Sequence, residues 1–216
     1  PETQQTARKQ TGSFYTPREI VQYMVDESLV AHLKRTVGNE LEGEYRKLLD
    51  YADNETSLTE QQKLAIMQSL YNCKILDPAC GSGAFPVGVL QQMVHILKQI
   101  DPDNSRCKNM LLQFAIDETS EAYLNSTAEE RREAVADIER AFDENVNYPD
   151  YARKLHLIEN CIYGVDIQPI AIQISKLRFF ISLVIDQKRN DNPADNFGIR
   201  PLPNLEAKFV AANSLL

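Results

Sequence analysis

The sequence of 216 residues contains no tryptophan, few other aromatic side chains and no long hydrophobic run. The longest apolar run, Leu177 to Ile185, is interrupted by Arg178 and Ser182 and is far shorter than the roughly 20 residues that span a bilayer. We therefore expect no transmembrane helix and no membrane partner. Hydrophobic residues still make up 43% of the chain, which is enough to form the core of a folded domain and excludes disorder.

Cysteine is also scarce, and its spacing is wide. The four cysteines include no C-x-x-C pair, so the sequence predicts neither a zinc knuckle nor a redox pair and favours a reducing compartment. The three histidines have no metal-ligand spacing either, so we expect no metal site. The polar start, Pro1 to Gly12, lacks an apolar signal-peptide centre and does not begin with Met, which predicts a cytoplasmic protein with a cut or processed start.

Positive charge is in deficit as well. The chain has 23 Lys and Arg residues against 31 Asp and Glu residues, which gives a formal net charge of -8. A protein that neutralises nucleic-acid phosphates along its whole surface carries the opposite sign. If nucleic acid is a partner, we expect most of the contact to lie outside this chain.

The first part of the chain, residues 1–71, predicts an N-terminal helical segment. Thr16-Pro17-Arg18-Glu19 is typical of a capping box with Pro at the first helical position, and apolar residues continue at helical spacing to Leu33. Thr59 and Gln62 open a second predicted helix. The apolar positions of this second helix are Leu64, Met67 and Leu70.

A strand, a tight loop and a helix are predicted from residue 75 onward. Ile75 and Leu76 end abruptly at Asp77-Pro78, and small residues follow through Ala84. Apolar residues then recur at the helical period. These positions are Val87, Leu90, Met93, Val94 and Leu97.

The same order of features occurs a second time. Ile162 to Val165 predicts a strand that ends at Asp166, and Pro169 begins a helix with its apolar residues on one face. This face carries Ile170, Ile174, Leu177, Ile181 and Val184. A third predicted strand, from Lys208 to Ala212, ends at Asn213.

Three strands separated by helical segments predict parallel pairing with right-handed crossovers, and hence an open α/β sheet with flanking helices. We assign this sheet to residues 72–216 and interpret the charged stretch at about residues 101–157, with a capping box at Thr127, as a helical insertion. Ligands of such sheets bind beyond the carboxyl ends of the strands. Asp77, Asp166 and Asn213 all fall at that edge.

Each of these edge residues has a simpler explanation. Gly81 and Gly83 allow close approach to a ligand, but a tight turn into a helix needs glycine for steric reasons alone. Asp166 could bind both hydroxyls of a ribose or cap the following helix, and Asn213 could meet an adenine amine or start a turn. Pro86 replaces the third glycine of the dinucleotide pattern and the ATP-binding P-loop pattern is absent, so NAD and ATP are poor candidates.

Taken in order, these segments resemble the motifs of class I S-adenosylmethionine-dependent methyltransferases, in the variant used by adenine-N6 DNA methyltransferases. The run from Asp77 to Phe85 (DPACGSGAF) resembles the cofactor loop. Thr11 to Pro17 (TGSFYTP) resembles the segment before the core in members whose cofactor region precedes the catalytic region. Ile162 to Pro169 is similar to the second cofactor motif, and Ala211 to Leu215 to the third. The resemblance covers most of the chain and is closest to large type IIG restriction-modification and phage-defence enzymes.

The resemblance implies a Rossmann-like core that binds S-adenosylmethionine, as part of an enzyme that methylates adenine N6. Double-stranded DNA would be bound through the full-length protein, and a nuclease domain in the same polypeptide is an implied partner. Thr16 and Asp77 would face the methionine end of the cofactor, and Gly81 would pass close to it. The implied cofactor-binding residues are Thr16, Asp77, Pro78, Ala79, Gly81, Gly83, Asp166, Ile167 and Asn213.

Three of these residues would bind the nucleoside. The resemblance implies that Asp166 holds the ribose hydroxyls and that Ile167 packs on the adenine ring. Asn213 would meet the adenine amino group, at a position where the family often has Asp. Asn keeps an acceptor there but removes a charge.

One part of the family pattern is missing. The catalytic N-P-P-Y or D-P-P-Y box should follow the third motif, but the sequence ends at Leu216, and Asn192-Pro193 precedes the third strand and lacks the aromatic residue. We therefore expect a cofactor-binding fragment that contains no catalytic residue and is inactive by itself. The alternatives are a methyltransferase for protein or a small molecule, and a non-catalytic nucleoside-binding module.

Overall fold

The computed structural model describes residues 16–52, 55–116, 127–201 and 203–214. The helices are α2 (Arg18–Thr36), α3 (Glu42–Leu49), α4 (Glu60–Asn72), α5 (Ala84–Ile100), α6 (Ser105–Ile116), α7 (Ala128–Ala141), α8 (Pro149–Asn160) and α9 (Pro169–Val184). Two short 3-10 helices are η1 (Asn39–Leu41) and η2 (Pro193–Gly198), and the strands are β1 (Ile75–Asp77), β2 (Ile162–Asp166) and β3 (Phe209–Ala211). No described helix is both long and apolar enough to cross a membrane.

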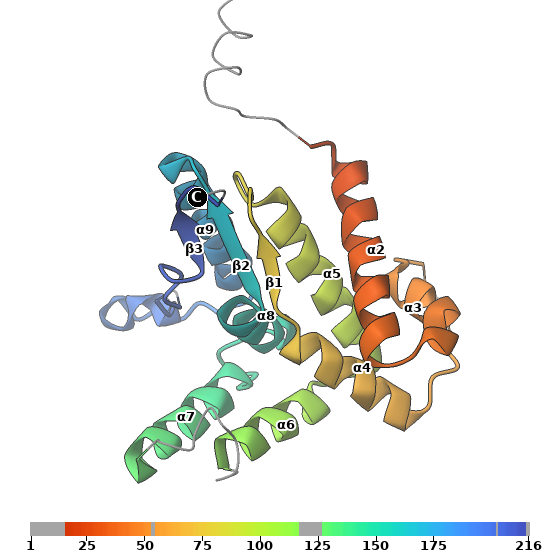
Figure 1. Ribbon diagram of the computed structural model, residues 1–216. Helices are drawn as coiled ribbons and strands as arrows, with labels where there is room; N and C mark the ends of the chain where they lie inside the picture. The colour runs from red at the N-terminus through yellow and green to blue at the C-terminus, as the bar shows by residue number, and fades with distance from the viewer. Residues whose placement is uncertain (1–15, 53–54, 117–126, 202, 215–216) are drawn as a thin grey trace, which may run out of the picture.

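The three strands form one parallel sheet in the order β1-β2-β3, which confirms the predicted strands and their pairing (Figure 1). Asp77 is in register with Gly164, and Asp166 is in register with Ala211. The carboxyl ends of all three strands therefore meet at one edge of the sheet. The predicted edge residues lie there or directly after it.

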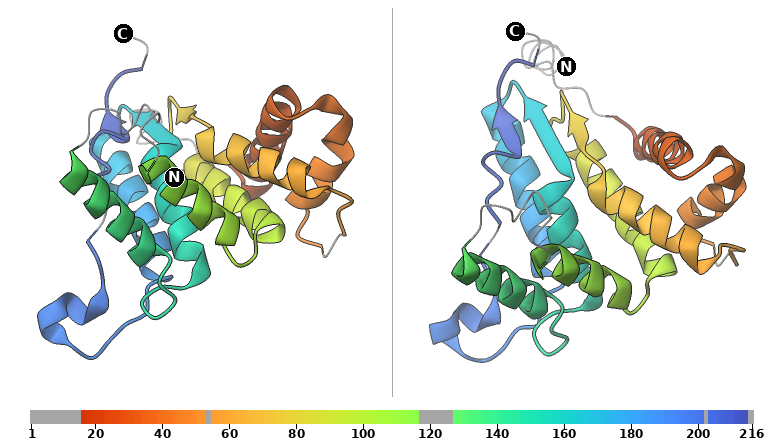
Figure 2. Two further views of the ribbon diagram at one scale, coloured as in Figure 1. Left: turned by 90° about the horizontal axis from the view of Figure 1, so that it is seen from below. Right: turned by 60° about the horizontal axis from the view of Figure 1, so that its bottom comes forward.

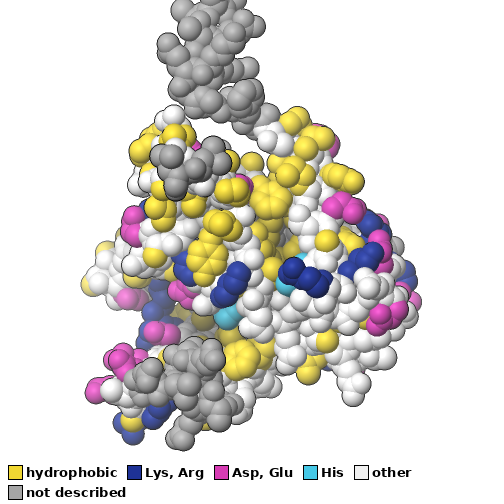
Figure 3. All heavy atoms as spheres, viewed as in Figure 1, with side chains coloured by type: hydrophobic (Ala, Val, Ile, Leu, Met, Phe, Trp, Pro, Cys, Tyr) yellow, Lys and Arg dark blue, Asp and Glu magenta, His cyan; other side chains and the backbone are white. Residues whose placement is uncertain are grey.

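The two faces of the sheet have different surroundings. Ile162 and Phe209 are fully buried on the face that α9 covers, behind the sheet in Figure 1. Successive side chains of a strand point to opposite faces, so Leu76 and Val210 point the other way, and both are exposed. Figure 3 shows hydrophobic side chains gathered across the upper part of this viewer-facing side.

The N-terminal helices share a core with α5. The side chains of Leu33, Leu48, Ile66 and Leu97 are fully buried in it, one from each of α2, α3, α4 and α5. The helix predicted to open at Thr59 is confirmed as α4, and it begins with a capping box. The Thr59 hydroxyl accepts a hydrogen bond from the backbone N–H of Gln62, and the Gln62 side chain accepts one from the N–H of Thr59. Helix α3 lies in a charged stretch for which the sequence pattern predicts no helix.

Two details of the predicted N-terminal segment are wrong. Thr16 does not cap α2, because Pro17 occupies the N-cap position and no side chain closes the helix. Pro17 has an extended ψ of 147°, so the helix begins one residue later than the pattern suggests. Leu64 is exposed, since α4 packs through Ile66, Met67 and Leu70.

Helix α9 begins at Pro169 as predicted, but its predicted apolar face is not the face that packs. Ile170, Ile174, Leu177 and Ile181 are all exposed. The buried residues of α9 are Ile172, Ser175, Lys176, Phe179 and Leu183. The inner face has to fit closely against the sheet, where the rings of Phe179 and Phe209 lie 4.8 Å apart between centroids.

The predicted helical insertion consists of α6, α7 and α8, and the capping box of α7 from Thr127 to Glu130 is confirmed. Figure 2 shows α6 and α7 side by side, and α8 then leads directly into β2. Arg153 of α8 is 1% exposed, and its guanidinium donates to the carbonyl oxygens of Asp101 and Pro102. The insertion thus leaves after α5 and returns beside the sheet.

Candidate functional site

The loop between β1 and α5 is held against the end of β2. The backbone N–H of Cys80 donates to the carbonyl oxygen of Val165 over 2.9 Å, and the N–H of Gly81 donates to Oδ2 of Asp166 over 2.9 Å. Asp77 turns the chain into this loop, because its Oδ1 accepts the N–H of Ala79 over 3.0 Å. Four of the nine predicted residues thus form two hydrogen-bonded pairs at this loop, Asp77 with Ala79 and Gly81 with Asp166.

The two loop positions Gly81 and Gly83 favour glycine for different structural reasons. Both have a left-handed backbone, with φ of +53° at Gly81 and +82° at Gly83. A Cβ on Gly83 would lie 2.4 Å from Oγ of Ser175, so this glycine is required where α9 approaches the loop. A Cβ on Gly81 would meet nothing within 4 Å. At Gly83 a collision with α9 therefore adds to the strain of the left-handed backbone, whereas at Gly81 only the backbone favours glycine and the space beside it is open.

Asp166 does not occupy the N-cap of α9, which is Gln168, and no side chain caps that helix. Its carboxylate accepts two backbone hydrogen bonds instead, at Oδ1 from Gln168 over 2.8 Å and at Oδ2 from Gly81. A carboxylate has about four acceptor positions, so this half-buried group retains capacity for further donors.

Negative charge and burial together change the acidity of this edge. Burial raises the pKa of Asp77 above its ordinary value, the N–H of Ala79 opposes this rise, and the neighbouring charge of Asp166 adds to it. Burial and the charges of the same two carboxylates raise the pKa of the Cys80 thiol to about 12. Cys80 is therefore a neutral, buried side chain of the loop at neutral pH and not a nucleophile.

The segment after β3 reaches the same loop. The N–H of Ala212 donates to the carbonyl oxygen of Asp166 over 3.0 Å, and the Ser214 hydroxyl donates to the carbonyl oxygen of Pro78 over 2.9 Å. Asn213 lies between these contacts and is exposed. It therefore lies at the predicted edge, and its contact with an adenine amino group stays a prediction.

The remaining predicted residues are less closely tied to the loop. Ile167 follows β2 directly and is exposed. Thr16 is exposed just before α2, whose first turn lies toward the same end of the molecule as the strand ends in Figure 1. Thr11 to Tyr15, the first part of the TGSFYTP segment, lies outside the described residues.

Three residues that support the loop are missed by the sequence analysis. Gly164 of β2 leaves no room for a Cβ, which would lie 2.7 Å from Phe209 and 2.8 Å from Sγ of Cys80. Ser175 faces Gly83, and Arg178 donates from Nη1 to the carbonyl oxygen of Ser82 over 3.0 Å. Glycine within a strand is a weak signal of such close approach. No local pattern indicates the other two.

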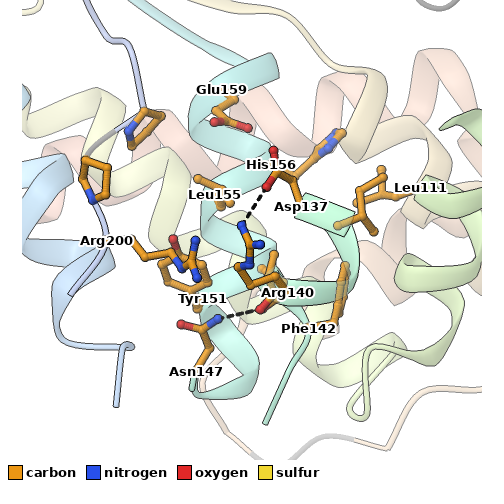
Figure 4. A pocket seen from close by; sticks show the side chains of 15 residues that line it. Leu111, Asp137, Arg140, Phe142, Asn147, Tyr151, Leu155, His156, Glu159 and Arg200 are labelled. Carbon is orange, nitrogen blue, oxygen red and sulfur yellow. Dashed lines mark hydrogen bonds and ion pairs between the residues drawn. The ribbon is translucent and has the colours of Figure 1, made fainter. Parts of the chain in front are cut away.

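Two cavities are formed by the insertion, away from the sheet edge. One has a volume of about 360 Å³ and is lined by residues of α7 and α8 together with Arg200 (Figure 4). Burial lowers the pKa of His156 in its wall to about 4. None of the nine predicted cofactor residues lines this cavity. Within the described ranges, no group of three or more His, Cys, Asp or Glu side chains is placed to hold a metal ion.

Comparison with known proteins gives one informative match. Over 217 residues the chain is 29% identical to a protein from Methanocaldococcus jannaschii that is provisionally named a type II restriction enzyme and methyltransferase. No family model and no solved structure matches the chain. The match covers 97% of this chain but only 15% of the archaeal protein. The chain is therefore similar, over nearly its whole length, to one part of a much longer protein whose name combines restriction with methylation.

Proposed function

We propose that this chain is the S-adenosylmethionine-binding part of a methyltransferase with a Rossmann-like core. The observation that carries the proposal is the link from the N–H of Gly81 to Asp166, which joins the glycine loop to the acid that ends the neighbouring strand. Open space beside Gly81 and remaining acceptor capacity on Asp166 both fit a nucleoside ligand at this edge. The name of the archaeal relative supports the same class of reaction.

The residues present fit the cofactor in chemical type. Asp166 would accept hydrogen bonds from the ribose hydroxyls, and the exposed side chain of Ile167 would cover the adenine ring. Asn213 would accept a hydrogen bond from the adenine amine, while Thr16 and Asp77 would meet the methionine end. When bound, S-adenosylmethionine supplies a methyl group activated by its sulfonium. The chain's own part is to hold and orient this cofactor.

The proposed acceptor is N6 of adenine in double-stranded DNA, within a restriction-modification or defence protein of the cytoplasm. The order of the motifs in the sequence and the name of the archaeal relative support this assignment. Because the net charge of this chain is -8, we assign most of the DNA contact to other parts of a longer polypeptide. The catalytic box and any nuclease domain would also belong to those parts.

Calorimetric titration with S-adenosylmethionine tests the cofactor site. Asp166→Ala should weaken binding by roughly 1.5 to 3 kcal/mol, because charge-assisted hydrogen bonds to the ribose are lost. Asp191→Ala, which removes an exposed carboxylate from the loop after α9, is the matched control and should bind as the unmodified chain does. Equal affinity of all three proteins would contradict the assignment of Asp166.

The acceptor is tested separately with the polypeptide extended beyond residue 216. Tritium from the labelled methyl group should appear in unmethylated double-stranded DNA as N6-methyladenine. Cofactor binding without transfer to DNA, but with transfer to protein or a small molecule, would overturn the DNA assignment and leave the cofactor site in place.

A further inference from the structure

The outer side of α9 carries an exposed row of aliphatic residues, here called the α9 stripe. The stripe consists of Ile170, Ile174, Leu177 and Ile181, together with Ile185 at the C-cap, which are 67%, 44%, 53%, 51% and 63% exposed. Steps of three and four residues place them along one side of a helix. The opposite side of α9 packs on β2 and β3, so the stripe faces away from the core. Contiguous apolar surface of this kind marks an interaction site.

The four isoleucines of the stripe are spaced symmetrically along the chain. Ile170 and Ile185 are equally far from the point between residues 177 and 178, and so are Ile174 and Ile181. The symmetrical positions also carry the same residue type, and Leu177 stands beside the centre. A twofold axis through this point would exchange the four isoleucine positions of two antiparallel copies and place the two Leu177 side chains beside each other, half a residue from the axis. Such self-complementarity is what a symmetric dimer interface requires.

The charges around the stripe are compatible with such a pairing. Every residue of α9 is described, and Arg178 is the one charged residue among its exposed positions. Its guanidinium donates to the carbonyl oxygen of Ser82, which draws the charge toward the glycine loop. Lys176, on the inner side, is paired with Glu206 over 2.6 Å. No acidic residue lies within the stripe to oppose its burial.

We propose that two copies of this chain associate through antiparallel α9 stripes. Ile170 would pack against the second copy's Ile185, Ile174 against its Ile181, and the two Leu177 side chains against each other beside the axis. Five such side chains present on the order of 500 Å² per copy, so the dimer buries on the order of 1,000 Å², the lower limit of specific interfaces. The dimer is therefore weak and forms at micromolar or higher concentration. Its axis passes close to the residues that hold the glycine loop.

Sedimentation velocity between about 1 and 200 μM tests the association. The unmodified chain should shift from monomer to dimer over this range, and Leu177→Asp should raise the dissociation constant at least 100-fold, since the change places two charges beside the axis. Leu64→Asp makes the same change at an exposed leucine of α4 and should leave the dimer unchanged. A chain that stays monomeric throughout, or a dimer that Leu177→Asp leaves intact, would overturn the proposal.

Cysteine cross-linking tests the register. All four native cysteines are buried, so disulfides between copies should form mainly through an added, exposed cysteine. Leu177→Cys should form a disulfide-linked dimer quickly, because residues that meet beside a twofold axis approach within the reach of a disulfide. Ile170→Cys alone should not, whereas Ile170→Cys combined with Ile185→Cys should. Equal cross-linking of the two single variants would contradict the antiparallel pairing, and circular dichroism shows whether each variant is folded.

Discussion

Helices α5 and α9 follow equivalent strands, yet their surroundings differ. In α5, ten of 17 residues are buried, whereas in α9 five of 16 are buried. α5 lies between the sheet and the N-terminal helices, while α9 contacts the sheet, α8 and α5 and leaves its outer side open. The same sequence pattern therefore produces an enclosed helix in one unit and a half-covered helix in the other. What differs is the number of elements packed around each.

The largest expected effect comes from shortening a leucine in each helix. Leu97 of α5 is fully buried, so Leu97→Ala should lower the free energy of unfolding by about 2 to 5 kcal/mol through lost burial and a cavity. Leu177→Ala on α9 should change it by no more than about 0.5 kcal/mol, because that side chain is exposed. Urea denaturation at a concentration below association measures both. Similar losses would show that α9 is enclosed after all.

The two loop glycines form the second comparison. Gly83→Ala should cost about 3 kcal/mol of stability, because it adds a collision with Ser175 to the strain of a left-handed residue. Gly81→Ala has the strain but no collision and should cost about 1 to 2 kcal/mol. Urea denaturation again provides the measurement.

Combining Gly83→Ala with Ser175→Gly separates the two causes. The second substitution removes the hydroxyl and Cβ nearest to the added methyl group, so it should recover the part of the loss that the collision causes. If it recovers nothing, the contact between the loop and α9 does not explain why residue 83 is glycine.

The acids that end β1 and β2 give the third and smallest contrast. Asp166→Asn should lower stability by about 1 to 3 kcal/mol, because one of the two N–H groups bound to the carboxylate would then face an amide NH₂. Asp77→Asn should instead raise stability slightly at neutral pH, since burial and the Asp166 charge both disfavour the ionised form of Asp77.

The pH dependence gives the sign of the Asp77 effect. The folded-state pKa of Asp77 is raised, so its contribution is most favourable below the unfolded value and declines as the pH increases through the folded value. The advantage of Asp77→Asn should therefore grow from about pH 4 upward and level off above the folded pKa. Denaturation curves at several pH values measure this. An advantage that grows as the pH falls would contradict the assigned direction.

Features that depend on nearby residues are predicted well from the sequence. The three strands, their parallel pairing, the start of α4 near Thr59 and the capping box of α7 are predicted from the sequence pattern and are confirmed. Asp77, Asp166 and Asn213 were predicted at one edge because parallel strands end together. Asp77 and Asp166 are the last residues of β1 and β2, and Asn213 lies just after β3.

Features that depend on distant partners are not predicted. The exposure of Leu177 depends on which elements pack around α9, and its periodic pattern is the same whether a neighbour is present or not. The need for glycine at residue 83 comes from Ser175, which lies on a helix far along the chain. Arg178 gives no local indication that it binds Ser82. The start of α2 is an exception among the local features, because Pro17 and not Thr16 takes the N-cap position.

Hydrogen exchange with and without S-adenosylmethionine locates the proposed cofactor site, where the glycine loop meets β2. We expect slower exchange of backbone amides in residues 77–85 and 164–170, because the cofactor covers the loop and the end of β2. Protection confined to residues that line the cavity of about 360 Å³, such as Ile138, His156 and Arg200, would contradict this site and move it to the helical insertion.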